Sequence, residues 1–418
     1  MSTDNVKVEL KERQTINLIP SANYAAQSVL DALGTIMQSP NSEGRVGKRY
    51  YPGTQFVDEV EMLCQRRALG AFSLSSRDWA VNVQSLSREL ARLQACSAVL
   101  HTDDRLLDLD SPHGSKYFTV LSLREHSHIS LASGQALQEI IELFRPRALI
   151  SNASQLTNNP TIGKICRAAG IHVIADMTET AGLVSSGLFP RPFEHADIVV
   201  AGTYGSLRGP SGAMIFSRKG LVVMQPGAKD SSERCSLEEA VHQSVFPGHQ
   251  GGPHNHTIMA MAVALGLAAM PSFKKYQETV LANAEVLADG LRNFGYHLDH
   301  TKPASHQLVM SLGSVDARPV NRVLDAIGVA TGPVSANKKL RFGTLAMSSR
   351  GLRSQDFRWV AKIIHEGVGI VQGTKTELLR SGAGLTANLD ARILDCPDIL
   401  ETRRKVIDKM NQFTVAID

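Results

Sequence analysis

Short apolar runs that alternate with helical segments constrain the fold of this chain more than any other feature. The spacing predicts strands in six stretches between residues 79 and 203, namely WAVNVQ, RLLDLD, YFTVLSL, RALISN, HVIADM and DIVVAGT. Strands and helices that alternate in this way form a mainly parallel sheet with helices on both faces. The sequence therefore predicts an α/β domain.

The pattern changes after Pro271, where FKKYQETVLANAEVLADGLRNFG has the apolar spacing of a long amphipathic helix. The elements expected after it are the strand HQLVMSL, a helix over 319–327, the stretch LRFGTLAM, a helix near 355–372 and a closing helix over 397–413. At 418 residues the chain exceeds the length at which one core keeps growing. We expect an extended N-terminal arm over 1–28, a large α/β domain over 29–271 and a smaller α+β domain over 272–418.

Composition argues against several classes of protein. The 44 basic and 40 acidic residues give a formal charge of +4 without a Lys/Arg block, so we expect no nucleic-acid partner. The apolar stretch Ile258–Met270 is too short to span a bilayer and predicts a buried helix. Five dispersed cysteines indicate a reducing compartment, and neither they nor the HSH and HNH stretches have metal-site spacing. The start MSTDNVKVELKERQ lacks a secretory or transit pattern, which favours the cytoplasm.

Seven stretches occur in the order of one enzyme family. They are NLIPSANY at 17–24, SEGRVGKRYYPGTQFVDEVEMLCQRRAL at 42–69, NVQ at 82–84, IADMTETAGLVSSGLFP at 174–190, TYGSLRGPSGAMIFSRKG at 203–220, VFPGHQGGPHNHTIMAMAVAL at 245–265 and LRFGTLAMSSRGL at 340–352. The chain resembles serine hydroxymethyltransferase, a fold-type-I enzyme that uses pyridoxal phosphate (PLP) and folate. The resemblance implies a mainly parallel, seven-stranded type of sheet between helices, followed by a smaller C-terminal domain.

The resemblance also shows a change where the family carries its reactive amine. PLP enzymes of this kind hold the cofactor through a lysine Schiff base. The family turn Thr-His-Lys-Thr-Leu corresponds to Thr203–Leu207 here, which aligns the lysine with Gly205. Lys219 lies beyond the next predicted strand and so at the opposite end of the sheet. We therefore expect that covalent attachment of PLP is lost.

Other cofactor positions differ as well. The family's phosphate-binding Ser-Gly-Ser becomes Ser87, Arg88 and Glu89, and a carboxylate at a helix N-terminus would repel a phosphate. The stacking histidine aligns with Lys116, or with Gly114 if no insertion is allowed. Elsewhere Glu179, Ser211 and Asn41 replace a family histidine, arginine and tyrosine, and ATGPVSANKK is shorter than the folate-contacting loop. We therefore expect no cofactor, neither covalent PLP nor folate.

Other family positions are retained, and their roles have alternatives. Ser154, Asp176 and Arg341 match pocket residues, and Arg341 matches the arginine that binds the substrate carboxylate. Asp176 is equally compatible with a helix cap, and Arg341 with pairing to an internal acid. Glu43 and Tyr51 match residues of the neighbouring subunit's pocket, where packing is the alternative role. Tyr204 is interpreted as a new acid or, preferably, as a plug.

These residues support two functional hypotheses. The first is a repurposed enzyme or binder for a small carboxylate-bearing molecule, in a homodimer, with lyase- or isomerase-type acid/base chemistry. The second is a non-catalytic subunit that pairs with an active serine hydroxymethyltransferase. The candidate residues are, for catalysis, Glu43, Tyr51, Glu179 and Tyr204; for substrate binding, Ser21, Ser154, Asp176 and Arg341; and for a vestigial cofactor site, Ser87, Arg88, Glu89, Lys116, Gly205, Gly251 and Gly252.

Overall fold

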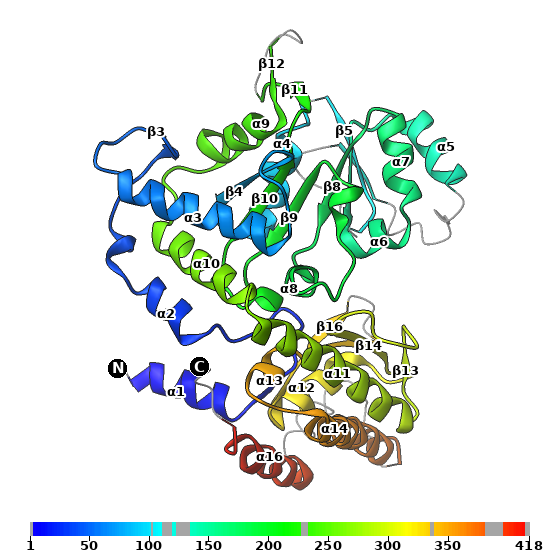
Figure 1. The fold of residues 1–418 in the computed structure, drawn as a ribbon. Coiled ribbons are helices and arrows are strands. Elements are labelled where there is room, and N and C mark those ends of the chain that lie inside the picture. The colour runs from blue at the N-terminus through cyan, green and yellow to red at the C-terminus, as the bar shows by residue number, and fades with distance from the viewer. Residues whose placement is uncertain are drawn as a thin grey trace. The chain divides into compact units, whose positions relative to one another are not determined.

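The structure is a computed structural model that divides into two compact units. One unit is Ser28–Phe273, and the other joins Met1–Gln27 to Lys274–Asp418. The residues that the structure describes are 3–101, 103–110, 119–122, 134–226, 233–334, 338–380 and 396–413. The chain as a ribbon is drawn in Figure 1.

The unit Ser28–Phe273 is built on a seven-stranded sheet (Figure 1). Its strands are β4 (Trp79–Ser85), β5 (Arg105–Asp108), β6 (Thr119–Ser122), β7 (Ala148–Asn152), β8 (His172–Asp176), β9 (Ile198–Gly202) and β10 (Ala213–Arg218). The strand order is β4-β10-β9-β8-β7-β5-β6. β10 is antiparallel to both of its neighbours, and the other paired strands are parallel. The predicted α/β class and its mainly parallel sheet are confirmed.

Helices cover both faces of this sheet because both sets of alternating strand residues are apolar. Ile174 and Ile198 belong to a buried cluster with α4 and α9, while Val173 and Val199 are buried on the opposite face. The helices of the unit are α2 (Gln27–Leu33), α3 (Gln55–Ala71), α4 (Arg88–Ser97), α5 (Gln135–Phe144), α6 (Ala153–Asn158), α7 (Thr161–Ala168), α8 (Ala181–Ser185), α9 (Leu237–Gln243) and α10 (Asn255–Ala268). Two hairpins, β2 (Gly44–Arg45) with β3 (Lys48–Arg49) and β11 (Val222–Met224) with β12 (Arg234–Ser236), complete it.

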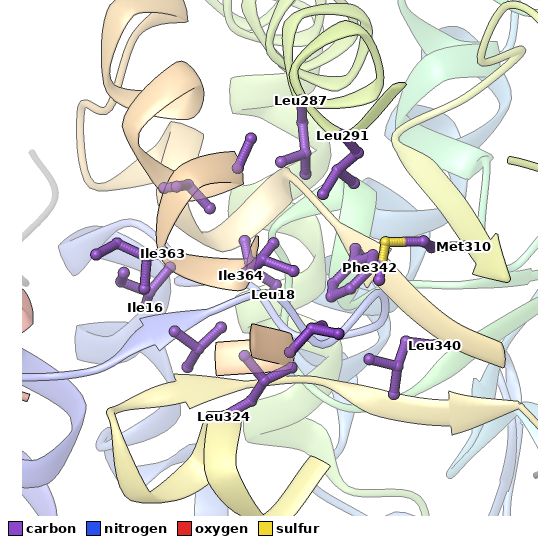
Figure 2. Close-up of a cluster of buried hydrophobic side chains, with 14 of the residues drawn as sticks. Ile16, Leu18, Leu287, Leu291, Met310, Leu324, Leu340, Phe342, Ile363 and Ile364 are labelled. Atoms are coloured by element: carbon purple, nitrogen blue, oxygen red, sulfur yellow. The ribbon is translucent and has the colours of Figure 1, made fainter. Parts of the chain in front are cut away.

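The second unit contains a four-stranded antiparallel sheet of order β13-β14-β17-β16. These strands are β13 (His297–Leu298), β14 (Gln307–Ser311), β16 (Gly332–Val334) and β17 (Lys339–Gly343). Its helices are α11 (Pro271–Asn293), α12 (Ala317–Ala326), α13 (Leu345–Ser349), α14 (Ser354–Arg380) and α16 (Pro397–Met410). Figure 2 shows its core, where Leu287, Leu340, Phe342 and Ile364 pack together.

The N-terminal segment is part of this second unit's core. β1 (Ile16–Asn17) pairs in parallel with β15 (Val329–Ala330), and Ile16 is fully buried. The extended arm expected there is wrong for its first part, because Thr3–Arg13 form the helix α1. Its apolar residues Val6, Val8 and Leu10 recur at every second position, so the segment lacks the 3.6-residue apolar period by which a helix is recognised in sequence. An ion pair one turn apart supports it instead, with 2.6 Å between Arg13 Nη2 and Glu9 Oε1.

Among the described residues no single helix is long and apolar enough to cross a membrane, although the successive helices α10 and α11 meet the criterion when taken together, by length and composition alone.

Candidate functional site at the carboxyl ends of the strands

Polar residues gather where the parallel strands of the seven-stranded sheet end. β5 ends at Asp108, β7 at Asn152 and β8 at Asp176. The carboxyl ends of parallel strands meet at one edge of a sheet, which is the usual place for ligands in open α/β folds. β4 ends at this edge as well, because β4 and β9 both run antiparallel to the β10 strand between them.

Asp176 is held by two arginines of α4. Arg88 Nε and Arg92 Nη1 donate to the same oxygen, Asp176 Oδ2, over 3.0 and 2.9 Å. Arg88 and Arg92 are four residues apart, so they lie on one side of the helix. Burial by itself raises the pKa of Asp176, but the charges of Arg88 and Arg92 outweigh it and hold the pKa below its usual value. Asp176 is therefore an ion-paired carboxylate rather than a helix cap.

The network continues through Arg92 to the neighbouring strands. Arg92 Nη2 lies 3.3 Å from Asp108 Oδ2, and Asp108 Oδ1 accepts a hydrogen bond from the Asp110 main-chain N–H over 2.9 Å. The Asp110 carboxylate in turn accepts from both the main-chain and side-chain nitrogens of Asn152. Burial raises the pKa of Asp110, and the main-chain N–H of Asn152 opposes that rise. Three strand ends are thus joined through carboxylates.

The first turn of α4 carries the residues that the resemblance aligns with the family's phosphate site, which we expect to be vestigial here. The Ser87 hydroxyl accepts a hydrogen bond from Leu90 N over 3.2 Å, so it caps its own helix. Glu89 places a carboxylate in the same turn. Arg88 Nη1 lies 3.9 Å from Glu179 Oε1, and the side chains of both residues remain about one-third exposed, at 30% and 36%. The outer part of the cluster is therefore accessible.

The turn after β9 places Tyr204 and Gly205 next to this cluster. Gly205 is buried and has a φ of +61°, a conformation that glycine adopts at little cost. Burial, followed by the negative charge of Glu89, raises the pKa of Tyr204. β10 runs back from this turn with Ser217 opposite Ile198, so Lys219 lies at the other edge of the sheet. Lys219 therefore cannot supply an amine at the position of Gly205.

A second group of candidates surrounds the β2–β3 hairpin. Tyr51 Oη donates to Glu43 Oε2 over 3.4 Å. The position that a side chain at Gly251 would occupy is 3.9 Å from Glu43 Oε1, and the corresponding position at Gly252 is 3.6 Å from Glu43 Cγ. Glu43 is therefore brought together with Tyr51 and the glycine-rich loop. Tyr51 is 44% exposed.

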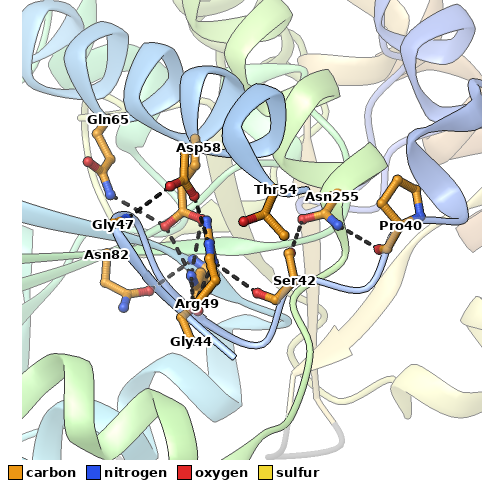
Figure 3. A network of polar contacts seen from close by, with 12 residues as sticks. Pro40, Ser42, Gly44, Gly47, Arg49, Thr54, Asp58, Gln65, Asn82 and Asn255 are labelled. Atoms are coloured by element: carbon orange, nitrogen blue, oxygen red, sulfur yellow. Dashed lines mark hydrogen bonds and ion pairs between the residues drawn. The ribbon is translucent and has the colours of Figure 1, made fainter. Parts of the chain in front are cut away.

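A buried arginine fixes the conformation of that hairpin, as Figure 3 shows. Arg49 donates to Asp58 and Glu61 over 2.7 and 2.6 Å and to two main-chain oxygens of the hairpin segment, those of Ser42 and Gly44. These contacts hold the loop in which Glu43 lies, because they tie residues on both sides of it to one guanidinium.

The remaining candidates lie elsewhere. Ser154 is in α6, where its main-chain oxygen accepts a hydrogen bond from Thr157 Oγ1 over 3.1 Å. Ser21 and Arg341 belong to the second unit, where Ser21 is exposed and Arg341 Nε donates to Gln307 Oε1 over 3.1 Å. Lys116, like the alternative Gly114, lies outside the described residues.

Sequence reasoning missed Arg92 and Asp108. Their side chains complete the ion-pair network around Asp176. The i, i+4 spacing of Arg88 and Arg92 was a signal that both face one way. Only the topology, which places the end of β5 two strands away from the end of β8, shows which acids they meet.

The fold and the comparisons agree on the class of protein. A seven-stranded, mostly parallel sheet covered by helices agrees with the class of fold-type-I PLP transferases. The family model for serine hydroxymethyltransferase matches residues 3–364, and the chain belongs to this family. It is 38% identical to the cytosolic serine hydroxymethyltransferase of Neurospora crassa over 98% of this chain and 91% of the relative. It is 37% identical to the mitochondrial serine hydroxymethyltransferase of Schizosaccharomyces pombe over 96% and 89% of the two chains.

Family membership corrects the expectation that the chain uses no cofactor. That expectation is wrong, because the family and its named relatives use PLP and folate. The described residues fit PLP only in part. An acid is present at Asp176, but the arginines of α4 engage it, and Gly205 has no amine to form a covalent bond.

The comparisons bear on assembly and location only at a coarse level. Members of the family are typically oligomers that bind small-molecule substrates. The names of the relatives include both cytosolic and mitochondrial proteins, so the cytoplasmic location stays a prediction.

Proposed function

We propose that this chain is a serine hydroxymethyltransferase family member that no longer performs lysine-dependent hydroxymethyl transfer at its own site. In its place the chain binds, and by acid/base chemistry converts, a small carboxylate-bearing molecule. The observation that carries the proposal is the pairing of Asp176 with Arg88 and Arg92 beside the turn that contains the buried Gly205, which the resemblance aligns with the family's lysine. The chain's own arginines neutralise the acid that PLP chemistry requires.

A carboxylate-binding residue is proposed separately for the second unit, where Arg341 is located. Its guanidinium hydrogen-bonds the amide oxygen of Gln307, and a carboxylate is a stronger acceptor for arginine than an amide because the bond is charge-assisted. A planar guanidinium also matches the two oxygens of a carboxylate, which lysine does not.

The proposed acid and base are Tyr204 and Glu179. Burial raises the pKa of Tyr204 above an already high ordinary value, so its hydroxyl is protonated at neutral pH and can donate toward an oxygen that becomes negative in the reaction. Glu179 is partly exposed and its carboxylate lies 3.9 Å from Arg88, so it suits a proton acceptor. The reaction class is an elimination, an aldol-type cleavage or an isomerisation, since each of these needs a proton to be moved at carbon or oxygen.

The test compares this chain with an active relative. Hydroxymethyl transfer from serine is measured with PLP and folate present, with the cytosolic Neurospora crassa enzyme as the positive control. We expect a rate at least a thousandfold below the relative's. A rate within tenfold of the relative's would overturn the proposal. Calorimetry with serine and other small amino and hydroxy acids then tests binding, which Arg341→Gln should weaken at least tenfold and the exposed Arg318→Gln should not change.

A second candidate function rests on the Glu43–Tyr51 pair. These side chains lie 3.4 Å apart on a hairpin fixed by Arg49, and Tyr51 is 44% exposed. A chain that keeps this pair has the residues to complete the pocket of an active partner, as a non-catalytic subunit. Mixed with an active relative, it should form a hetero-oligomer detectable by native mass spectrometry. Activity of that hetero-oligomer should fall with Tyr51→Phe but not with the neighbouring Tyr50→Phe, and failure to form one would exclude this function.

A further inference from the structure

A pocket of about 670 Å³ lies at the opposite edge of the seven-stranded sheet. The first residues of β4 and β8 and the last residue of β10 line it, namely Trp79, His172 and Arg218. All of its lining residues belong to the unit Ser28–Phe273. The volume is in the range of ligand sites, which is about 300–1,000 Å³. The residues discussed for the candidate functional site do not line it.

Three arginines from different elements meet in this pocket. Arg167 comes from the last turn of α7, Arg191 from the segment before η3 (Pro192–Glu194) and Arg218 from the end of β10. Each donates to a main-chain oxygen: Arg167 to that of Glu194 over 3.3 Å, Arg191 to that of Ser73 over 3.4 Å, and Arg218 to that of Ala196 over 3.2 Å. Within the described part of the chain none of the three forms an ion pair with a carboxylate.

Two acids, Asp197 and Glu194, line the pocket as well. The three arginines outnumber them, so the pocket keeps a net positive charge. The Asp197 carboxylate accepts a hydrogen bond from Val173 N over 3.1 Å and lies 3.8 Å from His172 Nδ1. Glu194 is exposed, and its contact with Arg167 is through the main-chain oxygen. Three guanidinium groups therefore face two carboxylates, one of which already accepts from the backbone.

Arg218 is the fixed element of the pocket. Its guanidinium carbon lies 4.7 Å from the centre of the Trp79 ring, and Phe193 packs edge-on against that ring at 5.2 Å. Its Nε is buried and has no hydrogen-bond partner among the described residues. Burial lowers the pKa of Arg218, and the negative charge of Asp197 opposes this only in part. An oxyanion would supply the charge-assisted partner that this guanidinium lacks.

We infer that this pocket is a second ligand site that binds a small organic oxyanion, a carboxylate or a phosphate monoester. Its charged head would be bound by Arg167, Arg191 and Arg218. Its apolar part would lie against Leu74, Ile171 and Leu221, which also line the pocket. This inference does not depend on the function proposed for the other edge of the sheet.

The test uses benzoate and phenyl phosphate as probes and uncharged benzamide as the control. The chain has two tryptophans, so Trp359→Phe leaves Trp79 as the reporter inside the pocket. We expect saturable changes in Trp79 fluorescence with at least one of the two anions, measured at constant ionic strength, and none with benzamide. The anion that binds more tightly shows whether the pocket prefers a carboxylate or a phosphate headgroup. Absence of saturable binding by both anions would overturn the inference.

Charge-removing variants locate the binding. Arg167 and Arg191 are exposed, so Arg167→Gln with Arg191→Gln should fold and should weaken the preferred anion at least tenfold. The matched control is Lys164→Gln, because Lys164 is exposed on the same helix as Arg167 but does not line the pocket. Equal affinity in the double variant and the control would show that anions bind elsewhere, and would also overturn the inference.

Discussion

Arg92 Nη1 lies 2.9 Å from Asp176 Oδ2, although 84 residues separate the two along the chain. This contact ties the first turns of α4 to the end of β8. Asp176 is almost fully buried, so its charge depends on the arginines that surround it. A buried carboxylate that loses its partners is costly, and so are partly buried arginines that lose their carboxylate.

The Asp176→Asn substitution should therefore destabilise the unit Ser28–Phe273. It removes the charge that neutralises Arg88 and Arg92 while keeping the shape of the side chain. We expect a loss of about 3 kcal/mol in the free energy of unfolding. Denaturant unfolding in the Trp359→Phe background, followed by the fluorescence of Trp79, reports on this unit. Glu59→Gln on the exposed face of α3 is the control and should change stability by less than about 0.5 kcal/mol; an equal effect of the two would contradict the prediction.

Returning a lysine to position 205 tests the cofactor chemistry directly. Gly205 has a φ of +61°, so Gly205→Lys should cost about 1–2 kcal/mol of stability. With PLP and borohydride, we expect a covalent adduct at residue 205 by peptide mass spectrometry. Hydroxymethyl transfer should nevertheless stay low, because Arg88 and Arg92 still engage Asp176.

A second positive-φ glycine provides the control for that substitution. Gly220 has a φ of +81°, lies beyond β10 near the opposite edge of the sheet, and has open space around its Cβ position. Gly220→Lys should fold with a similar cost and give no adduct at residue 220. A folded Gly205→Lys protein without an adduct would show that residue 205 is not at the cofactor position. Full hydroxymethyl-transfer activity of Gly205→Lys would show that the ion pairs of Asp176 with Arg88 and Arg92 do not impede the reaction.

How much of the fold the sequence predicts depends on the kind of signal each element carries. The strands β4, β8 and β9 were predicted because their apolar runs are short, β-branched and bounded by polar turns. α1 was not predicted, because its apolar residues alternate along the chain and do not follow the 3.6-residue period of a helix.

The candidate site was predicted in part for similar reasons. Asp176, Arg88 and Gly205 could be placed from the resemblance, since each sits in or beside a recognisable motif. The pairing of Asp176 with Arg92 could not, because α4 and β8 are far apart in sequence and only the strand order brings them together. The change of Asp176 from a possible helix cap to an ion-paired carboxylate follows from that contact alone.

The side chain of His242 should make the protein sensitive to acid. Burial, and then the positive charge of Arg45, lower the pKa of His242 to about 4, although Glu239 opposes this. Neutral His242 accepts a hydrogen bond at Nδ1 from Asn82 Nδ2 over 2.9 Å. In the unfolded chain a histidine has a pKa of about 6.5. Between these two values the unfolded state binds more protons, so stability falls as the pH drops from about 6.5 to about 4.

His242→Gln removes this titration while keeping an acceptor for Asn82. The free energy of unfolding of the native sequence should fall by up to about 3 kcal/mol more than that of the variant between pH 6.5 and pH 4. Denaturant melts at half-unit pH steps measure the two slopes. Parallel slopes across that window would contradict a depressed pKa for His242.

The N-terminal segment should depend on one buried arginine of the second unit. Arg350 is 4% exposed, and its guanidinium donates to main-chain oxygens of the N-terminal segment and of the segment at the end of α16. Its acceptors, at 2.8 to 3.2 Å, are those of Glu12, Arg13, Thr15, Met410 and Phe413. Arg350→Lys keeps the charge but replaces a planar fork of donors with a single ammonium group that cannot reach all five oxygens. We expect a loss of about 3 kcal/mol in the free energy of unfolding, because several buried carbonyl groups lose their partners.

Hydrogen exchange should quicken first in Thr3–Arg13 and Pro397–Met410. The control Arg353→Lys alters an exposed side chain nearby and should leave both helices protected. Unchanged exchange in these helices in Arg350→Lys would show that other contacts hold the N-terminal segment in place.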